Sequence, residues 1–277
     1  MVRLIAGLVG LFFSGMLLIS FVTGAYTAVT EPVTPTVESQ FHKHPKKVSF
    51  AHDGPFGAYD KAQLQRGLKV YAEVCAACHS LNQVAFRNFE DLGYSEDEVK
   101  AIARGWKTEV PSINPETGEP ATRPGLPSDK IPSPFANETA ARAANNNALP
   151  PDLSLMTKAR HNGTAYVYSL LTGYTAVPAN LPKESRPGAG LHYNPYFANL
   201  NLAMAPPITG DDQVTYDDGT KATKDQMAKD VAAFLTWTAE PKMEARKTAG
   251  WAALIFLIIF TGLCYLSYRT IWADKKH

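Results

Sequence analysis

The pentapeptide Cys75-Ala76-Ala77-Cys78-His79 constrains this chain more than any other feature. The pattern Cys-x-x-Cys-His is typical of a c-type haem attachment site. Two thiols three positions apart on one helical turn can each form a thioether bond to one side of a porphyrin, and His79 then lies under the iron as an axial ligand. We therefore expect one covalently attached haem c.

Two other chemistries share part of this pattern. A redox dithiol also uses Cys-x-x-Cys, but thioredoxin-like proteins place it in a βαβ context, which this sequence does not show. A zinc site needs a second pair of ligands, and none is found. The remaining cysteine, Cys264, lies far away in an apolar run and is expected to be a small apolar filler. Haem attachment is the favoured interpretation.

A helix is expected to lead into the motif, from residue 61 to about residue 75. Asp60 is a suitable N-cap, since a short carboxylate accepts hydrogen bonds from the first free backbone N–H groups. Apolar residues then recur at helical spacing and form one face. They are Leu64, Leu68, Tyr71 and Val74. This face would deliver the two cysteines to a buried site.

Two long apolar runs flank the chain. Residues 4–22 carry no charge and follow Arg3. A cleaved signal peptide, with Thr23-Gly24-Ala25 as its small-residue site, and an uncleaved anchor of about 20 apolar residues both fit this run. Either alternative exports the segment that follows, because Arg3 stays on the inner side.

The second run predicts a C-terminal membrane anchor. The 21 residues 248–268 carry no charge. At 1.5 Å per residue they span about 31 Å, close to the roughly 30 Å of a bilayer core. Aromatic residues near both ends fit interfacial belts. They are Trp251, Tyr265, Tyr268 and Trp272. Lys275 and Lys276 follow, so we place the C-terminus inside.

Composition excludes some functions. The 277 residues have a net charge of +1 and no basic stripe, so nucleic-acid binding is not expected.

Residues 30–50 are rich in Pro, Thr, Lys and His and predict an extended linker. His42, His44 and His52 suggest a metal site, but solvated histidines are the favoured interpretation.

Further helices and one long loop are expected between these regions. Capping boxes at residues 95–98 and 223–226 predict two helices, the first ending at Gly105 and the second pausing at Pro241. Short helices are expected at 140–147 and 164–171. Residues 111–134 contain so many prolines that we expect no regular element there.

A haem iron held by His79 needs a sixth ligand unless it binds small molecules. Methionine raises the reduction potential, because thioether sulfur favours ferrous iron. Met156 follows a Pro-Pro-Asp-Leu stretch, and Met204 lies in a loop stiffened by Pro206 and Pro207. Spacing alone leaves both methionines as candidates.

Short motifs spread over the chain resemble the cytochrome c1 family, the haem subunits of cytochrome bc1 complexes. The matching segments are residues 54–60, 63–67, 70–71, 75–80, 143–146, 148–154, 158–161, 169–174, 193–197, 203–207 and 237–241. They run from about residue 53 to 270 and are followed by a single C-terminal anchor. One departure is Asn147, which replaces the glycine that the family usually has after the paired asparagines.

The resemblance implies a mainly α fold: a class I cytochrome c-like haem domain with long irregular loops. It implies thioethers at Cys75 and Cys78, with His79 and Met204 as the axial iron ligands. Other residues are implied to contact the haem: Asn145, Arg160 and Tyr166 at its propionates, and Pro150 and Pro151 packed against it. His161 is expected to be structural.

The resemblance also implies an organisation and a set of partners. Domains are expected at 1–29 (signal peptide or anchor), 30–50 (linker), 51–241 (haem domain), 242–272 (transmembrane helix) and 273–277 (cytoplasmic tail). The chain would pass single electrons from the Rieske iron–sulfur protein to a soluble or anchored cytochrome c, beside cytochrome b and membrane lipid in a dimeric complex. We expect a bacterial inner membrane, with the haem domain on the periplasmic side. Candidate docking residues for a basic acceptor are Glu90, Asp91, Glu96 and Glu98.

Overall fold

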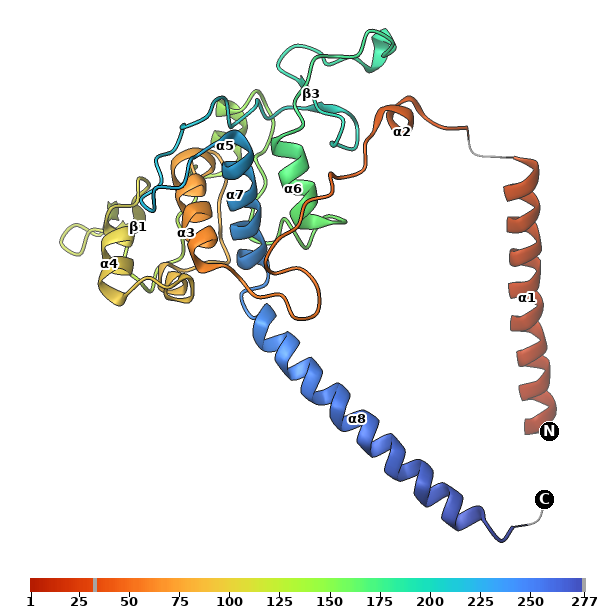
Figure 1. The fold of residues 1–277 in the computed structure, drawn as a ribbon. Coiled ribbons are helices and arrows are strands. Elements are labelled where there is room, and N and C mark those ends of the chain that lie inside the picture. Colours follow the sequence, from red (N-terminus) through yellow and green to blue (C-terminus); the bar gives the residue numbers. More distant parts are fainter. Residues whose placement is uncertain (32–33, 276–277) are drawn as a thin grey trace. The chain divides into compact units, whose positions relative to one another are not determined.

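The computed structural model describes residues 1–31 and 34–275 of the chain. They form two compact units, residues 1–41 and residues 42 onward. Both are mainly helical, which confirms the expected fold class (Figure 1). Residues 32–33 of the expected linker and residues 276–277 of the expected tail, which include Lys276, lie outside the described part.

The first unit contains α1 (Val2–Thr30) and the short helix α2 (Val37–Phe41). No residue of α1 is buried, although the helix is almost entirely apolar. By length and composition it is able to cross a membrane, as is α8 of the second unit. The structure is equally compatible with a cleaved leader and a retained anchor.

Two crossing helices form the centre of the second unit, α3 (Lys61–Val70) and α7 (Lys224–Ala239). The helices touch at Gly67, where a Cβ atom would meet the Asp230 carbonyl oxygen at 2.2 Å. Only glycine permits this approach of two backbones. The expected helix before the cysteines is confirmed, but its last turn, η1 (Tyr71–Cys75), is a wider π-helical turn.

A buried carboxylate joins the two helices. The side chain of Asp230 is fully buried and accepts hydrogen bonds from Arg66 Nε at 3.0 Å and from the Gln63 and Gln226 amides at 3.0 and 2.8 Å. Removing one partner of such a buried pair typically costs about 3–5 kcal/mol. These bonds therefore fix the register of α3 against α7.

Three helix starts follow the expected capping chemistry. Asp60 accepts a hydrogen bond from the Gln63 N–H, and Ser95 and Glu98 form a reciprocal box at the start of α4 (Glu96–Arg104). Thr223 caps α7 at the Gln226 N–H, but the Gln226 side chain binds Asp230 rather than returning to the cap. The second capping box is therefore only half formed.

The remaining elements surround this centre. Helix α6 (Gly163–Leu171) packs on α7, and α4 packs on the 3-10 helix η2 (Phe86–Leu92). Aromatic residues fill the core between them, and they include Tyr71, Phe86, Phe89, Phe234 and Trp237. Helix α5 (Glu138–Ala144) begins two residues earlier than expected, because Asn137 caps it. The segment between α6 and α7 contains η3 (Lys183–Ser185) and two paired strands of two residues each, β3 (His192–Tyr193) and β4 (Asn201–Leu202).

The expectation of no regular element in residues 111–134 is wrong. Strands β1 (Val110–Ile113) and β2 (Pro120–Arg123) form an antiparallel hairpin. Each strand of a two-stranded ribbon has one unpaired edge, where a proline without an N–H group costs no ladder hydrogen bond. Gly118, at φ +72°, permits the turn between the strands. The proline count alone was therefore a poor guide.

The expectation of an extended linker over residues 30–50 is wrong at Val37–Phe41, which forms α2, and residues 43–50, which have no regular structure, lie against the domain. The Lys43 N–H donates to the Pro195 carbonyl at 2.7 Å, the Lys46 N–H donates to Ser169 Oγ at 2.8 Å, and Phe50 is buried. His42 and His44 are exposed. His52 is buried, so the expectation of a solvated histidine is wrong there.

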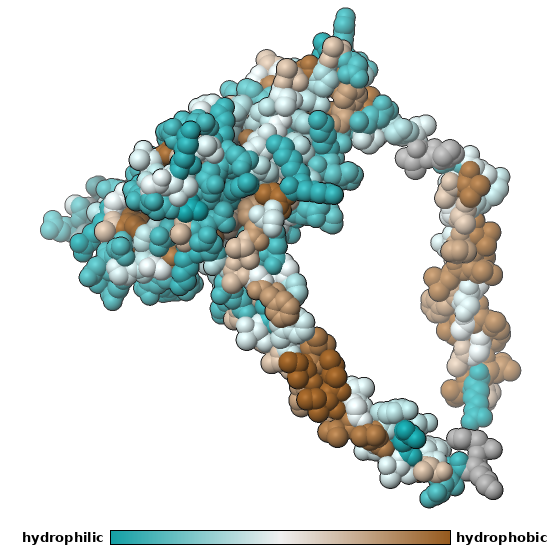
Figure 2. Space-filling view, viewed as in Figure 1, coloured by the Kyte–Doolittle hydropathy of each residue, from teal (hydrophilic) through white to brown (hydrophobic). Residues whose placement is uncertain are grey.

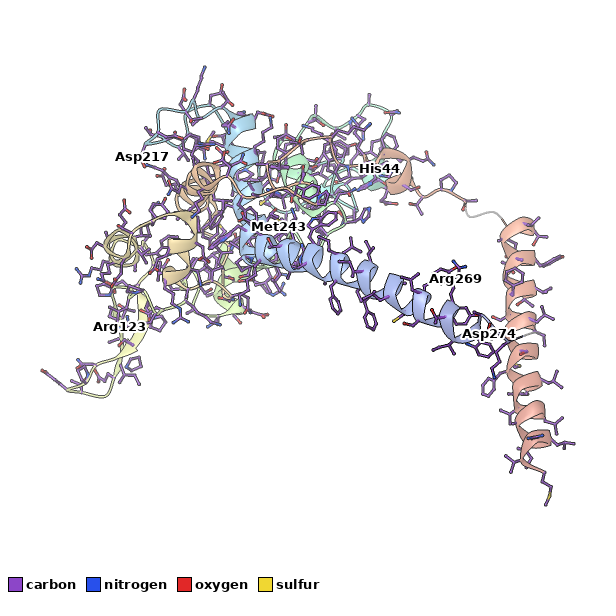
Figure 3. All side chains as sticks on the ribbon, turned by 60° about the horizontal axis from the view of Figure 1, so that its bottom comes forward. His44, Arg123, Asp217, Met243, Arg269 and Asp274 are labelled. Atoms are coloured by element: carbon purple, nitrogen blue, oxygen red, sulfur yellow. The ribbon has the colours of Figure 1, made fainter. Side chains whose placement is uncertain are left out.

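The second unit ends in α8 (Met243–Trp272), whose first residue is buried in the domain and whose apolar side chains beyond Lys247 are exposed. Figure 2 shows a hydrophobic band over the middle of this helix, and Figure 3 shows Met243 where α8 leaves the domain and Arg269 near its far end. The expected C-terminal apolar helix is confirmed.

Candidate functional site

The Cys-x-x-Cys-His segment lies at the end of the helix that the α3–α7 crossing holds in place. The Cys78 and His79 N–H groups both donate to the Cys75 carbonyl, at 3.1 and 2.9 Å, so the segment continues the turn begun by η1. Both cysteines are free and partly buried. Burial raises the pKa of the Cys75 thiol to about 12, and Cys78 adds to the rise. An uncharged sulfur suits this environment.

The ring of His79 is oriented by a backbone carbonyl. Its Nδ1 atom lies 2.8 Å from the Pro151 oxygen, which only accepts hydrogen bonds, so Nδ1 carries the proton of the neutral ring. Burial lowers the pKa of His79, opposed by the Pro151 carbonyl and by Asp152. The neutral ring therefore presents an unprotonated Nε2, which is the form that binds a metal.

Residues 150–156, which we call the strap that carries Pro151, are bound to the residues that directly follow His79. The Leu153 N–H donates to the Ser80 carbonyl at 2.9 Å, and Asp152 accepts from Ser80 Oγ at 2.8 Å and from the Asn82 N–H at 2.7 Å. Burial works to raise the pKa of Asp152, but hydrogen bonds from Asn82, Ser154 and Ser80 outweigh it and lower the pKa. The Pro151 carbonyl is thus held firmly against the His79 ring.

Tyr71 supports the backbone of His79. The Tyr71 hydroxyl donates to the His79 carbonyl at 2.8 Å, and the ring is fully buried. From the sequence pattern, Tyr71 was expected on an apolar helix face and not in a bond to His79. Its position eight residues before His79 gave no signal for this bond.

Met204 lies in a loop that is fixed by two side chains. The Tyr174 hydroxyl donates to the Met204 carbonyl at 3.0 Å. The amide of Gln213 donates to the Pro207 carbonyl at 2.9 Å and accepts from the Thr209 N–H at 2.8 Å. Neither Tyr174 nor Gln213 had been assigned a role. The Met204 side chain is itself partly buried.

The rival methionine, Met156, lies on the strap that carries Pro151. Its N–H donates to the Leu153 carbonyl at 3.2 Å, and its side chain packs against the hydrophobic core. A methionine whose side chain packs into the core is less available as a ligand than one in a loop.

Three of the other expected haem contacts, Pro150, Pro151 and Tyr166, lie in two segments. Pro150 and Pro151 begin the strap beside His79. Tyr166, in the first turns of α6, is close enough to Tyr174 to help burial raise the pKa of that phenol. The structure therefore brings Pro151 to His79, and Tyr166 to the tyrosine that binds the Met204 carbonyl.

Asn145 and Arg160 make local hydrogen bonds within the part of the chain that the structure describes. The Asn145 amide donates to the Ala141 carbonyl at 2.7 Å, and Arg160 donates to the Ala159 carbonyl at 3.0 Å. Arg160 is exposed, so its guanidinium is accessible to an anion. Asn147 adopts φ +65°, a conformation that asparagine tolerates better than most residues, which explains why it can stand where glycine is usual. His161 is exposed.

These residues fit a c-type haem. The motif offers two sulfurs on one turn beside an imidazole whose free nitrogen is defined by a carbonyl. A metal ion without a porphyrin fits less well. Within residues 1–31 and 34–275, no group of three or more His, Cys, Asp or Glu side chains is arranged to hold one.

Comparison with known proteins agrees with this geometry. The model of the cytochrome C1 family matches residues 50–275. Cytochrome c1 of Rhodospirillum rubrum is 46% identical over 243 residues, which cover 83% of this chain and 88% of that protein. Cytochrome c1 2, heme protein, mitochondrial, of Arabidopsis thaliana is 48% identical over 81% of this chain and 71% of its own length.

A third relative matches nearly the whole chain. The cytochrome b-c1 complex catalytic subunit, mitochondrial, of Candida albicans is 42% identical over 268 residues, which cover 96% of this chain and 91% of that protein. With a family model over most of its length and such relatives, this chain belongs to the cytochrome c1 family.

Proposed function

We propose that this chain is the membrane-anchored, mono-haem electron carrier of a cytochrome bc1 complex. It receives single electrons from the Rieske iron–sulfur protein and passes them to a soluble or anchored c-type cytochrome. The observation that carries the proposal is the orientation of the His79 ring. His79 directly follows the paired cysteines, and its Nδ1 atom lies 2.8 Å from the Pro151 carbonyl oxygen. Family membership and the relatives named for a heme protein and for a b-c1 complex subunit support it.

In this proposal Cys75 and Cys78 would hold one haem through thioether bonds, and His79 Nε2 and the Met204 sulfur would be the ligands of its iron. The bound haem iron supplies a one-electron couple whose potential the methionine raises. The protein residues keep both ligands in place during the change of oxidation state. Asn145, Arg160 and Tyr166 would hold the haem propionates, Arg160 by its charge, and Pro150 and Pro151 would pack on the porphyrin.

The proposed domains follow from the same assignment. Residues 51–241 form the haem domain, residues 242–272 the transmembrane helix and 273–277 a cytoplasmic tail; residues 1–29 are a leader or a second anchor, joined by the segment 30–50. Two long apolar helices support membrane attachment. The haem domain lies on the periplasmic side of a bacterial inner membrane, in a dimeric complex with cytochrome b.

Two matched variants test the ligand assignment, Met204→Leu and Met156→Leu. We expect Met204→Leu to keep the covalent haem, to lose the methionine-to-iron absorption band and to have a much lower reduction potential, since axial ligands tune haem reduction potentials over about 0.8 V. Met156→Leu should keep both the absorption band and the reduction potential of the wild type. The opposite result would make Met156 the ligand, and no covalent haem on a denaturing gel would reject the whole proposal.

Purification in mild detergent tests the place of the chain in a complex. Co-elution with a cytochrome b and a Rieske protein is the expected result. A chain that elutes alone, with its haem intact, would instead be a free-standing anchored cytochrome.

A further inference from the structure

Residues 50–58, which we call the Phe56 loop, have a fixed shape. The Asp53 carboxylate accepts from the Phe50 N–H at 2.8 Å, and the Ala58 N–H donates to the Ala51 carbonyl at 3.1 Å. At Gly57 a Cβ atom would meet the Asp53 carbonyl oxygen at 2.1 Å, so the backbone folds tightly on itself. This closed loop presents the Phe56 side chain outward, 80% exposed.

The Phe56 loop is attached to the first turns of α8 (Figure 1). Glu244, Lys247 and Trp251, spaced three and four residues apart, lie on one face of that helix and point at the loop. Four hydrogen bonds form the attachment: Tyr59 N–H to Glu244 at 2.7 Å, Lys247 Nζ to the His52 and Gly57 carbonyls at 2.8 and 2.9 Å, and Trp251 Nε1 to the Pro55 carbonyl at 3.3 Å. The loop cannot move independently of the helix while these bonds hold.

The exposed ring of Phe56 stacks on Trp251. The ring centroids are 4.9 Å apart and the planes differ by 2°. Trp251 lies in the first turn of the charge-free run 248–268, at the level where tryptophans of membrane helices meet the lipid headgroups. Stacked face to face with Trp251, Phe56 lies at the same depth. Whatever covers α8 at this level also covers Phe56.

The polar groups of the loop suit a poorly hydrated boundary. Side chains of α8 satisfy the carbonyls of His52, Pro55 and Gly57. A loop in open water needs no such donors, whereas backbone groups near lipid must find partners within the protein. The Lys247 ammonium is sequestered by two of these carbonyls, which lowers the cost of holding a charge there.

The size of the patch favours lipid over a protein partner. Two aromatic rings bury about 150–250 Å² each when fully covered. A stable protein interface takes about 800 Å² from each partner. A single exposed ring beside a tryptophan is instead typical of an interfacial membrane contact.

We propose that the Phe56 loop is a second membrane contact of the haem domain, separate from the anchor helix, in which the Phe56 ring enters the headgroup region beside Trp251. The proposal rests on α8 being a membrane anchor. Its consequence is orientational: the stacked pair and the hydrogen bonds to α8 set the angle between the domain and the bilayer.

Spin labels on single cysteines test the proposal in the full-length holoprotein in phosphatidylcholine vesicles. Collision rates are measured with oxygen, which concentrates in lipid, and with a water-soluble nickel chelate. The wild-type chain labelled at Cys264 reports on α8. The double variant Cys264→Ala, Phe56→Cys reports on the loop, and Cys264→Ala, Ile113→Cys is an exposed control, since Ile113 is 68% exposed on the β1–β2 hairpin.

We expect a several-fold higher oxygen-to-nickel ratio at position 56 than at position 113, below the ratio at Cys264. A water-like ratio at 56 with a lipid-like ratio at 264 overturns the Phe56 proposal alone. A water-like ratio at 264 removes the anchor, and labelling of Cys75 or Cys78 contradicts haem attachment; both count against the proposed function instead.

A second preparation, the assembled complex in the same vesicles, identifies a protein partner. A label at 56 that both reagents fail to reach would show that protein covers the loop, and would overturn the lipid assignment. If the Phe56→Cys chain lacks the parent's absorption spectrum, Pro55→Cys carries the label one position earlier on the same exposed turn.

Discussion

The hydroxyl of Tyr174 donates a hydrogen bond to the carbonyl of Met204 at 3.0 Å, across 30 positions of sequence. Tyr71 makes the equivalent bond to the carbonyl of His79 at 2.8 Å. Each proposed axial ligand is therefore supported at its backbone by a tyrosine. Since a ligand that shifts between oxidation states slows electron transfer, we interpret both tyrosines as positioning residues.

The variant Tyr174→Phe tests this interpretation at the methionine. It leaves the partly buried Met204 carbonyl without its donor, which costs about 1–3 kcal/mol. Because the loop that carries Met204 loosens, we expect a weaker methionine-to-iron absorption band and a lower midpoint potential.

Tyr59→Phe is the matched control. The Tyr59 hydroxyl also donates to backbone, to the Glu240 carbonyl at 3.0 Å, but at the end of α7. It should lose comparable stability and keep the band and the potential. If both variants change the spectrum equally, the Tyr174 bond contributes only to general stability.

Gly67 is the second position at which the structure predicts the effect of a substitution, here on thermal stability. In Gly67→Ala the new methyl group would meet the Asp230 carbonyl at 2.2 Å and Phe234 Cβ at 2.6 Å, so α3 and α7 must separate. Overpacking of this kind costs about 1–3 kcal/mol or more. For a domain of this size each kcal/mol lowers Tm by about 2–4 °C.

Gly188→Ala serves as the control, because apart from its chain neighbours no atom of the described residues lies within 4 Å of its added Cβ. Thermal melts should separate the two variants. Since α3 leads directly into Cys75, Gly67→Ala should also lower the yield of covalent haem. Equal melting temperatures would show that the helices can separate without cost.

The features predicted correctly from sequence depend on neighbours in sequence. Asp60, Ser95 and Thr223 each bind an N–H three residues away, and residue type with spacing is enough to identify such caps. The Cys-x-x-Cys-His turn is local in the same way. The π-helical form of the turn before it was not predicted, because nothing in its residues distinguishes it from an α-helical turn.

The features that were missed depend on distant contacts. His52 is buried because the loop around it binds Lys247, which is 195 residues later. The bond from Tyr174 to the Met204 carbonyl, across 30 positions, is equally invisible in a linear pattern. The β1–β2 hairpin was missed for another reason: proline density indicates where a sheet interior is impossible, but a two-stranded ribbon has no interior.

His52 gives an expectation for pH. Burial lowers its pKa, Lys247 contributes in the same direction and Asp53 opposes them. Its Nε2 has no hydrogen-bond partner among the residues the structure describes. As the pH falls, the unfolded chain therefore takes up this proton at about pH 6.5, whereas the folded chain takes it up only at lower pH. The contribution of His52 to the free energy of unfolding is thus fully present above about pH 6.5 and is lost as the pH drops toward the folded pKa.

The variant His52→Phe keeps a ring between Phe50 and Tyr59, on which His52 packs, and removes the titration. We expect Tm of the wild type to fall more between pH 8 and pH 5 than Tm of the variant. Each unit by which the pKa is lowered corresponds to about 1.4 kcal/mol. Parallel pH profiles would show that His52 takes up its proton equally well in both states.

The acidic residues proposed to guide a basic acceptor differ in how cleanly they can be tested. Glu98 accepts from the Ser95 N–H at 2.7 Å in the cap of α4, and Glu96 pairs with Lys100 at 2.8 Å. A lysine at position 98 would remove a cap worth about 1 kcal/mol and confuse stability with docking. Glu90 and Asp91, both exposed at the end of η2, are the better positions.

We therefore expect the double variant Glu90→Lys, Asp91→Lys to reduce a basic cytochrome several-fold more slowly in stopped-flow measurements near 10 mM salt. The difference should shrink at higher salt, because the Debye length falls from about 30 Å at 0.01 M to about 10 Å at 0.1 M. The double variant Glu184→Lys, Glu116→Lys reverses two exposed charges elsewhere on the domain and makes the same change in net charge, so it controls for net charge. Equal rates for wild type and Glu90→Lys, Asp91→Lys at low salt would exclude Glu90 and Asp91 from the docking surface, and an equal slowing by the control variant would show that overall charge, rather than a local patch, steers the acceptor.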